Sequence, residues 1–407
     1  MKTPNPALRH VLFLNWRDTL NPEGGGSEVY VERIAAELVA RGHQATLLCA
    51  AHGNGPAEEV NAAGVRILRR GGRHTVYARA ALTYLAGWFG LGRLRRGAAG
   101  RARPDLIIDV CNGLPFLSPL WSRRPVVALV HHVHREQWPV VLPPRAARFG
   151  WWIESSLAIR VYRRCRYVTV SAATRDELAV LGVDPQRVTV VHNGTPEVSA
   201  VRAAKTAEPT LVVLGRLVPH KQVEVALRAL AALSQRWPAL AVVVAGQGWW
   251  EPKLRAYAAE LGVGDRVRFA GFVSDEEKQA LLSSAWLALT PSLKEGWGLT
   301  IVEAGAQGTP TVAFRSAGGV AEAVMDGRTG LLADDEEEFV AHVRTLLADD
   351  ERRATMGAAA RIYADGFTWS AAGDKFAAAI GVGTATQTAT AGTYGATRSR
   401  TPDLPRP

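Results

Sequence analysis

Two glutamates, Glu295 and Glu303, stand eight residues apart in the stretch P-S-L-K-E-G-W-G-L-T-I-V-E, which runs from residue 291 to 303. An ionised carboxylate only accepts hydrogen bonds, so each glutamate is suited to hold hydroxyl groups. Glu295 opens a glycine-rich turn and would face the hydroxyls of a sugar. Glu303 lies two turns into an expected helix, from which it could reach the vicinal diol of a ribose. The spacing alone also fits an ordinary strand–helix turn with two solvated carboxylates.

The order of elements around these glutamates is typical of a phosphate site. A buried strand is expected to end at Thr290, and a helix is expected from Leu299 to Ala306. The free N–H groups in the first turn of a helix and the positive end of its dipole suit a phosphate, and glycines let the backbone approach a ligand. We therefore expect a phosphate-bearing donor to contact the turn and the first helical residues, Gly296, Trp297, Gly298, Leu299 and Thr300.

Two positive charges, Arg216 and Lys221, follow a strand expected from Leu211 to Gly215. Ligands of open parallel sheets bind beyond the carboxyl ends of the strands, which is where these side chains would lie. Arginine offers a bidentate fork and lysine a point charge, so the pair could neutralise a diphosphate leaving group. Surface arginines and lysines are common, however, and the pair taken alone is a weak signal.

These motifs together resemble a known family. E-G-W-G-L-T-I-V-E resembles the E-x7-E signature of retaining glycosyltransferases with the GT-B fold, glycosyltransferase family 4 in particular, and G-R-L-V-P-H-K resembles the family's Gly-Arg…Lys motif. The resemblance covers roughly residues 10–380 and implies that Glu295 contacts the donor sugar, that Glu303 contacts the nucleotide ribose, and that Arg216 and Lys221 stabilise the diphosphate. No D-x-D motif stands in a plausible position, so we expect metal-independent chemistry with no cofactor beyond the sugar nucleotide.

A strand–glycine loop–helix–strand unit opens the chain. The strands are expected at 10–16 and 44–50, the loop at 24–28, and a helix between them ends at Gly42. This unit indicates the start of a doubly wound sheet. The resemblance implies that Gly25 and Gly26 in the loop touch the donor's diphosphate or sugar and border the acceptor. A plain tight turn is the alternative.

Three histidines follow the strand expected from Val126, in the order His131-His132-Val133-His134. They suggest a metal site, but no acidic or cysteine ligand stands at ligand spacing and alternate strand residues point opposite ways, so we expect no metal. The resemblance implies that His131, or failing that His132, acts beside the donor sugar, by donating to a hydroxyl or through its backbone carbonyl. A histidine packed in the core is the alternative.

The remaining short apolar segments form two series, in which strands alternate with helices. We predict an α/β protein of the GT-B class, in which two doubly wound Rossmann-like domains face each other across a cleft. The resemblance implies that a last helix crosses back onto the first domain and that Val273 lies near the base, while Glu322 is taken as helix structure. The expected ranges are 1–198 for the acceptor domain, 199–366 for the nucleotide-sugar domain, 367–380 for the crossing helix and 381–407 for a disordered tail.

The composition of the chain indicates the cellular compartment of the protein and the kind of partner that it binds. The chain has 407 residues, 47% of them hydrophobic, a net charge of +10 and three cysteines without a C-x-x-C pair, which indicates a reducing, cytoplasmic location. The stretch 66–166 contains 19 basic and 4 acidic residues, with tryptophans interleaved. This pattern predicts peripheral binding to an anionic membrane at its inner face. A buried interface or a solvated surface is the alternative, and no nucleic-acid motif is visible.

The sequence thus predicts a retaining transferase. It would move a hexose-type sugar from a nucleoside diphosphate sugar to a lipid-linked or other glycan or small-molecule acceptor, in cell-envelope glycoconjugate synthesis. The alternatives are a GT-B sugar-nucleotide epimerase and a non-catalytic sugar-nucleotide-binding protein on the same fold. The identity of the sugar, the nucleotide and the acceptor stays open, as does the oligomeric state.

Overall fold

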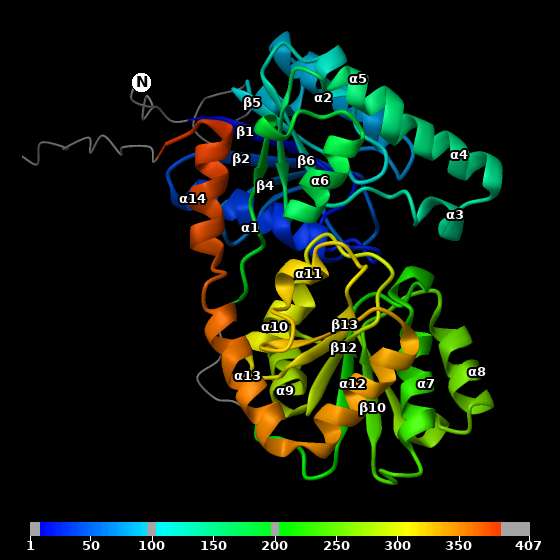
Figure 1. The fold of residues 1–407 in the computed structure, drawn as a ribbon. Coiled ribbons are helices and arrows are strands. Elements are labelled where there is room, and N and C mark those ends of the chain that lie inside the picture. The colour runs from blue at the N-terminus through cyan, green and yellow to red at the C-terminus, as the bar shows by residue number, and fades with distance from the viewer. Residues whose placement is uncertain (1–8, 96–102, 197–202, 384–407) are drawn as a thin grey trace, which may run out of the picture.

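A computed structural model describes residues 9–95, 103–196 and 203–383, and it contains two sheets, each with helices on both faces (Figure 1). The first sheet has the strand order β3-β4-β2-β1-β5-β6-β7-β8 and is parallel except for the pair β3–β4. Its strands are short, and the central ones, β1, β5 and β6, are wholly buried, as strands covered on both faces must be. The strands of the first sheet are β1 (His10–Leu14), β2 (Gln44–Cys49), β3 (Glu58–Val60), β4 (Arg66–Arg69), β5 (Leu106–Val110), β6 (Val126–Val130), β7 (Arg166–Thr169) and β8 (Val188–Val190).

The second sheet is parallel throughout and has the order β11-β10-β9-β12-β13-β14. In both sheets the strand order reverses beside the first strand, which creates the crevice where open sheets bind ligands. The strands of this sheet are β9 (Thr210–Leu214), β10 (Ala241–Ala245), β11 (Val267–Gly271), β12 (Leu287–Thr290), β13 (Thr311–Phe314) and β14 (Gly330–Ala333).

Helices of the first domain follow the expected apolar spacing. In α1 the buried positions Val31, Ile34 and Leu38 form one stripe, and Gly42 has the left-handed φ of 83° that ends the helix. Between α4 and α5 the chain takes one π-helical segment, residues 153–158. The helices are α1 (Gly26–Ala40), α2 (Val76–Trp88), α3 (Trp138–Val141), α4 (Pro144–Trp152), α5 (Ile159–Val161) and α6 (Ala172–Val180).

Helices of the second domain cover its sheet on both faces (Figure 1). The predicted bounds of α10 agree with the structure, and the strands whose ends were predicted end within two residues of those positions. The helices are α7 (Val223–Leu233), α8 (Glu251–Glu260), α9 (Asp275–Ser284), α10 (Leu299–Ala306), α11 (Val320–Ala323), α12 (Glu336–Ala348) and α13 (Asp350–Ala364).

The last helix, α14 (Trp369–Ile380), leaves the second domain and packs on α1 of the first (Figure 1). Phe376 stacks on Phe13 of β1 with 6.2 Å between ring centroids, and Arg41 pairs with Asp374. The crossing-back helix is therefore confirmed, and with it the GT-B arrangement of two facing Rossmann-like domains. Of the tail expected to be disordered, 381–383 continue along the first domain, and 384–407 lie outside the described residues.

Candidate active site

The carboxyl end of β9 places the first two predicted residues, Arg216 and Lys221. Gly215 has a φ of 154°, which turns the chain sharply, and a Cβ at Gly246 would lie 1.9 Å from the Gly215 carbonyl oxygen. Only glycine allows this approach of the two strand ends. A short 3-10 turn, residues 219–221, then presents the Lys221 ammonium toward the end of β12.

Glu295 meets Lys221 at this edge of the sheet. Its carboxylate accepts hydrogen bonds from the Lys221 ammonium and from Ser292 Oγ, the latter at 2.7 Å, and its side chain is only 15% exposed. Burial alone would raise the pKa of Glu295, but the charge and hydrogen bond of Lys221 and the hydrogen bond of Ser292 hold that pKa below its ordinary value. Glu295 is therefore an ionised acceptor beside a fixed positive charge.

The glycine turn leads directly into α10, as predicted. Gly298 is the N-terminal cap of this helix and has a φ of 97°, which disfavours any residue with a Cβ. Leu299 and Thr300 form the half-exposed first turn. Two turns on, Glu303 is buried and accepts a hydrogen bond from Lys278 Nζ at 2.8 Å. Burial raises the pKa of Glu303, and Lys278 offsets only part of this increase.

The glycine loop of the first domain lies against two elements of the second domain, the segment that follows β9 and the start of α10. Glu28 Oε2 accepts a hydrogen bond from the Gly25 N–H at 2.7 Å, which holds the loop in place. A Cβ on Gly25 would lie 3.1 Å from Arg216 Nε, and one on Gly26 would lie 3.8 Å from Leu299 Cδ2. The predicted donor-binding residues of the two domains are thus brought together at the domain interface.

A further arginine, Arg17, lies at this meeting point and was not predicted. It is 4% exposed, and its Nε donates to Glu28 Oε1 at 3.2 Å. Burial lowers the pKa of Arg17, Glu28 raises it, and the charge of Arg216 lowers it again. The two guanidinium groups lie close together, because both donate a hydrogen bond to the Glu23 carbonyl. Its place directly beyond the end of β1, in W-R-D, is the signal that could have found it.

His131 lies at the end of β6, beside the glycine turn of the second domain. Its ring is 5% exposed and meets the edge of Tyr30 at 5.3 Å between centroids. Burial lowers the pKa of His131 to about 4, so the ring is neutral at pH 7, and its Nε2 has no hydrogen-bond partner among the described residues. A Cβ on Gly296 would lie 2.5 Å from the His131 carbonyl oxygen. The side chain and the carbonyl therefore both lie at the domain interface.

The neighbouring histidines are held by other partners. His132 Nε2 lies 3.1 Å from Gln137 Oε1, and His134 lies between Glu154 at 2.9 Å and Asn112 at 3.1 Å. In the parts of the chain that the structure describes, no group of three His, Cys, Asp or Glu side chains is arranged to hold a metal. Both ring nitrogens of His134 are therefore engaged by other side chains, Nδ1 by Glu154 and Nε2 by Asn112.

His220 was not predicted as a site residue and lies in the short turn beyond the end of β9. It precedes Lys221, and burial together with the charges of Lys221 and Arg216 lowers the pKa of His220 to about 4. The charge of Glu295 acts against this shift, and that of His134, from the opposite domain, adds to it. The His220 carbonyl accepts a hydrogen bond from the Leu293 N–H at 2.9 Å, so His220 lies beside the segment that carries Glu295.

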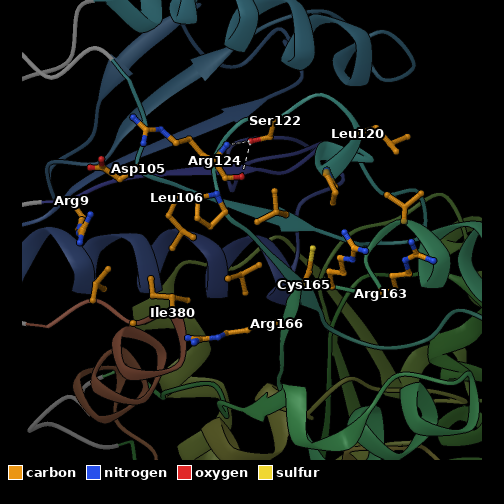
Figure 2. Close-up of a pocket in the computed structure, with 18 of the residues that line it drawn as sticks. Arg9, Asp105, Leu106, Leu120, Ser122, Arg124, Arg163, Cys165, Arg166 and Ile380 are labelled. Atoms are coloured by element: carbon orange, nitrogen blue, oxygen red, sulfur yellow. Dashed lines mark hydrogen bonds between the residues drawn. The ribbon is translucent and has the colours of Figure 1, made fainter. Parts of the chain in front are cut away.

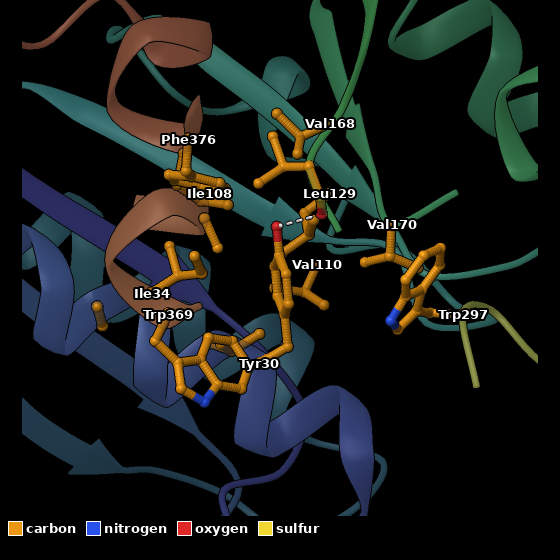
Figure 3. Packing of buried hydrophobic residues seen from close by; sticks show 14 of the residues in the cluster. Tyr30, Ile34, Ile108, Val110, Leu129, Val168, Val170, Trp297, Trp369 and Phe376 are labelled. Atoms are coloured by element: carbon orange, nitrogen blue, oxygen red, sulfur yellow. Dashed lines mark hydrogen bonds between the residues drawn. The ribbon is translucent and has the colours of Figure 1, made fainter. Parts of the chain in front are cut away.

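The predictions for Trp297 and Glu322 need correction (Figure 3). The Trp297 side chain is 3% exposed and stacks on His192 at 4.2 Å between centroids, so it belongs to the hydrophobic core that joins the domains, and only its backbone could meet a donor. Glu322 is more than helix structure, because it accepts hydrogen bonds from the backbone N–H groups of Ala172 and Ala173 at the start of α6. The contacts of both side chains with the first domain, which is distant in sequence, thus determine what they do.

Val273 is the predicted residue with the least support from the geometry. It follows β11, at the edge of the second sheet, two strands away from β9. Val273 is half-exposed, and its neighbour Phe272 is 76% exposed. An open apolar edge of this kind is compatible with a base, but no contact joins Val273 to the glutamates described above.

The basic stretch 66–166 does not form the single surface that we expected. Arg66 and Arg69 are buried and paired with carboxylates, and Trp151 packs partly into the core. Among the side chains of this stretch that stay exposed is an apolar ridge on α3, α4 and the turn between them, formed by Val140, Val141, Leu142, Phe149 and Trp152. Among the described helices, none is long and apolar enough to cross a membrane.

Comparison with known proteins gives consistent results along the chain. The model for Glycosyltransferase Family 4 matches residues 24–197, and the model for Glycosyl transferases group 1 matches residues 195–363. A GDP-mannose-dependent alpha-(1-6)-phosphatidylinositol monomannoside mannosyltransferase from Mycolicibacterium smegmatis is 31% identical over 373 residues, which cover 88% of this chain and 94% of that protein.

Solved structures share the fold at lower identity. Sucrose-phosphate synthase from Thermosynechococcus elongatus superposes with a TM-score of 0.74 at 18% identity, over 91% of this chain and 98% of that one. The Anabaena HepE protein in complex with UDP and glucose superposes with a TM-score of 0.69 at 20% identity, with the same coverage.

Proposed function

This chain belongs to glycosyltransferase family 4, and from that membership we propose that it transfers a hexose-type sugar from a nucleoside diphosphate sugar with retention of the anomeric configuration. The observation that carries the proposal is the convergence of Arg216, Lys221 and the start of α10 at one point, opposite the glycine loop of the first domain. This arrangement offers fixed positive charge to a diphosphate and a carboxylate acceptor, Glu295, to a sugar.

The chemistry that these groups support is leaving-group stabilisation. As the bond between the anomeric carbon and the phosphate oxygen breaks, negative charge grows on the diphosphate, where Arg216 and Lys221 stabilise it. The acceptor hydroxyl attacks from the same face, and its proton passes to the departing phosphate oxygen, so the configuration is retained. Glu295 is held by Lys221 and serves as a hydrogen-bond acceptor for the sugar, and the protein otherwise positions the reactants.

The donor and acceptor are proposed from the 31% identical relative, whose name specifies GDP-mannose and a phosphatidylinositol monomannoside. We propose GDP-mannose as the first donor to test and a lipid-linked glycan of the cell envelope as the acceptor. A panel of UDP-, GDP- and ADP-sugars, screened by thermal shift and then by transfer to a lipid acceptor, tests the proposal. Stabilisation by a sugar nucleotide without transfer to any acceptor would favour an epimerase or a binding protein.

Metal-independent turnover is a further expected result. Because Arg216 and Lys221 supply the charge that a divalent cation would otherwise supply, addition of EDTA should leave the transfer rate unchanged. The rate is measured by release of labelled nucleotide before and after chelation. Restoration of a lost activity by Mg²⁺ would contradict this role for the two side chains.

The two glutamates should separate nucleotide binding from sugar transfer. We expect Glu303→Gln to weaken binding of the bare nucleoside diphosphate by roughly tenfold, because its carboxylate would hold the ribose, while Glu295→Gln spares that binding and lowers transfer. Calorimetry with nucleotide and with sugar nucleotide measures the split, and Glu276→Gln, an exposed position on α9, is the control. Equal losses for both ligands in both variants would refute the assignment.

We propose that the enzyme works at the inner face of the cell membrane and docks through the apolar ridge. Phe149 and Trp152 are 61% and 48% exposed and stack on each other at 5.9 Å, with the exposed arginines Arg145 and Arg148 beside them. Exposed apolar side chains beside basic ones suit the surface of an anionic bilayer. This position would bring the first domain to a membrane-presented acceptor.

Vesicle sedimentation tests the ridge. We expect Phe149→Ser with Trp152→Ser to reduce retention on vesicles of phosphatidylglycerol and phosphatidylcholine several-fold at low salt, because the inserted apolar area is lost. Trp249→Ser with Ile362→Ser is the control, since these apolar residues of the second domain are at least as exposed. Retention that falls equally in both variants, or in neither, would show that the ridge does not dock.

A further inference from the structure

A second pocket, of about 920 Å³, lies at the amino ends of β5, β6 and β7 (Figure 2). The candidate active site lies beyond the carboxyl ends of the strands, so this pocket is at the opposite edge of the first sheet. One wall is formed by Ile380, Gly381 and Val382, where the chain leaves α14. The pocket therefore has no residue in common with the site described above.

The charge of the lining is strongly one-sided. Asp105 is the only acidic residue among the lining residues, and its carboxylate already accepts a hydrogen bond from the backbone N–H of His10 at 2.9 Å. Within the described parts of the chain, Arg160, Arg163, Arg164 and Arg166 form no ion pair with a carboxylate. The arginines that line the pocket are Arg9, Arg124, Arg160, Arg163, Arg164 and Arg166.

Local contacts hold this charge in place without neutralising it. Arg166 Nη1 donates to the Ala379 carbonyl at the end of α14, at 3.4 Å, and Gly381, with a φ of 74°, brings the chain close to the same guanidinium. The Nε of Arg124 is shielded from solvent and has no hydrogen-bond partner among the described residues. Arg163, Arg164 and Arg166 are exposed, so their guanidinium groups are accessible to an anion that enters the pocket.

The sequence that follows the wall of the pocket carries few acidic side chains. Residues 384–407, which follow the wall of the pocket, contain Arg398, Arg400 and Arg406 but only one acidic side chain, Asp403. The apolar side chains that line the pocket beside the arginines, among them Leu106, Val126 and Ile380, add a surface that suits a hydrocarbon group. The lining thus combines guanidinium groups, which recognise phosphate through paired hydrogen bonds, with an apolar wall.

We propose that this pocket is a second binding site, for a phosphate ester that carries an apolar group. The phosphate contacts Arg163, Arg164 and Arg166, and the apolar part lies against β5, β6 and the end of α14. The ligand is either the head group of an anionic lipid or a soluble phosphorylated molecule. The proposal does not depend on the assignment of the active site, because the two sites share no residue.

Site-resolved arginine modification tests the proposal. Phenylglyoxal reacts with accessible guanidinium groups, and peptide mass spectrometry reads each position separately. UDP is present in excess as an internal control, and slower modification of Arg216 would report its binding between the domains. The probes are dihexanoyl phosphatidic acid, inorganic pyrophosphate and dihexanoyl phosphatidylcholine.

We expect phosphatidic acid to slow modification of Arg163, Arg164 and Arg166 about threefold or more, and phosphatidylcholine to leave it unchanged. Protection by phosphatidic acid alone identifies a lipid source, and equal protection by pyrophosphate identifies a soluble phosphate. If neither anion protects these arginines, or if phosphatidylcholine protects them equally, the pocket is not a phosphate site.

A charge-neutralised variant gives a second test on the full chain. We expect Arg163→Gln with Arg164→Gln to weaken phosphatidic acid binding, measured by calorimetry with UDP in excess, by about tenfold. Arg344→Gln with Arg352→Gln removes two exposed charges from the second domain and should leave binding unchanged. Thermal melting checks that both variants are folded. Equal weakening in the two variants would show that binding follows net charge, and would overturn the proposal.

Discussion

Replacing Lys221 by alanine should lower the transfer rate by roughly 10²- to 10³-fold, the range found when one preorganised group that stabilises developing charge is removed. Two effects add in this variant. The leaving diphosphate loses a fixed positive charge, and Glu295, which is buried beside Lys221, loses its ionic partner. The second effect raises the pKa of Glu295 toward protonation, so that the variant's activity should also fall further as the pH decreases.

Arg216→Ala should reduce transfer to a similar degree. Arg216 lies against Gly25, and together with Arg17 it donates a hydrogen bond to the Glu23 carbonyl. Single-turnover kinetics with saturating donor measures both variants. The control is Arg236→Ala, an exposed residue of the same domain. Unchanged melting temperatures with unchanged rates would show that neither Lys221 nor Arg216 acts on the leaving group.

The second large effect is expected from Gly296→Ala. An added Cβ would lie 2.5 Å from the His131 carbonyl oxygen and 3.1 Å from its carbon, both of which belong to the opposite domain. Neither backbone segment has a flexible side chain that could move aside, so the two domains must separate. A shift of about 1 Å between reacting groups can cost 10²-fold in rate, and we expect a loss of that order.

Nucleotide binding distinguishes this mechanism from simple loss of the site. Most of the groups proposed to bind the nucleotide, Arg216, Lys221 and Glu303 among them, belong to the second domain, so Gly296→Ala should weaken binding of the nucleoside diphosphate far less than it lowers transfer. Gly53→Ala is the matched control, because a Cβ there meets no atom within 4 Å. Transfer at the normal rate in Gly296→Ala would mean that catalysis does not need the domain contact seen in the structure.

The sequence by itself determined the elements whose signals are local. Apolar runs that alternate with helical segments predicted the two parallel sheets, and the bounds of α10 were correct because helix start and stop signals act within a few residues. The edge strands β3 and β14 were not predicted, since E-E-V and G-L-L-A are too short to show a pattern. β3 pairs with β4 and β14 pairs with β13, so the place of each is set by its neighbour in the sheet.

Only the tertiary structure decided which side chains face the ligand region and which join the domains. Trp297 and Glu322 lie in motifs that resemble donor-site or helical segments, yet their side chains contact His192 and the start of α6 in the first domain. Arg17 and His220 reach the site through the same docking. Side-chain direction across an interface depends on how two separately folded surfaces meet, and no local pattern in the chain encodes that contact.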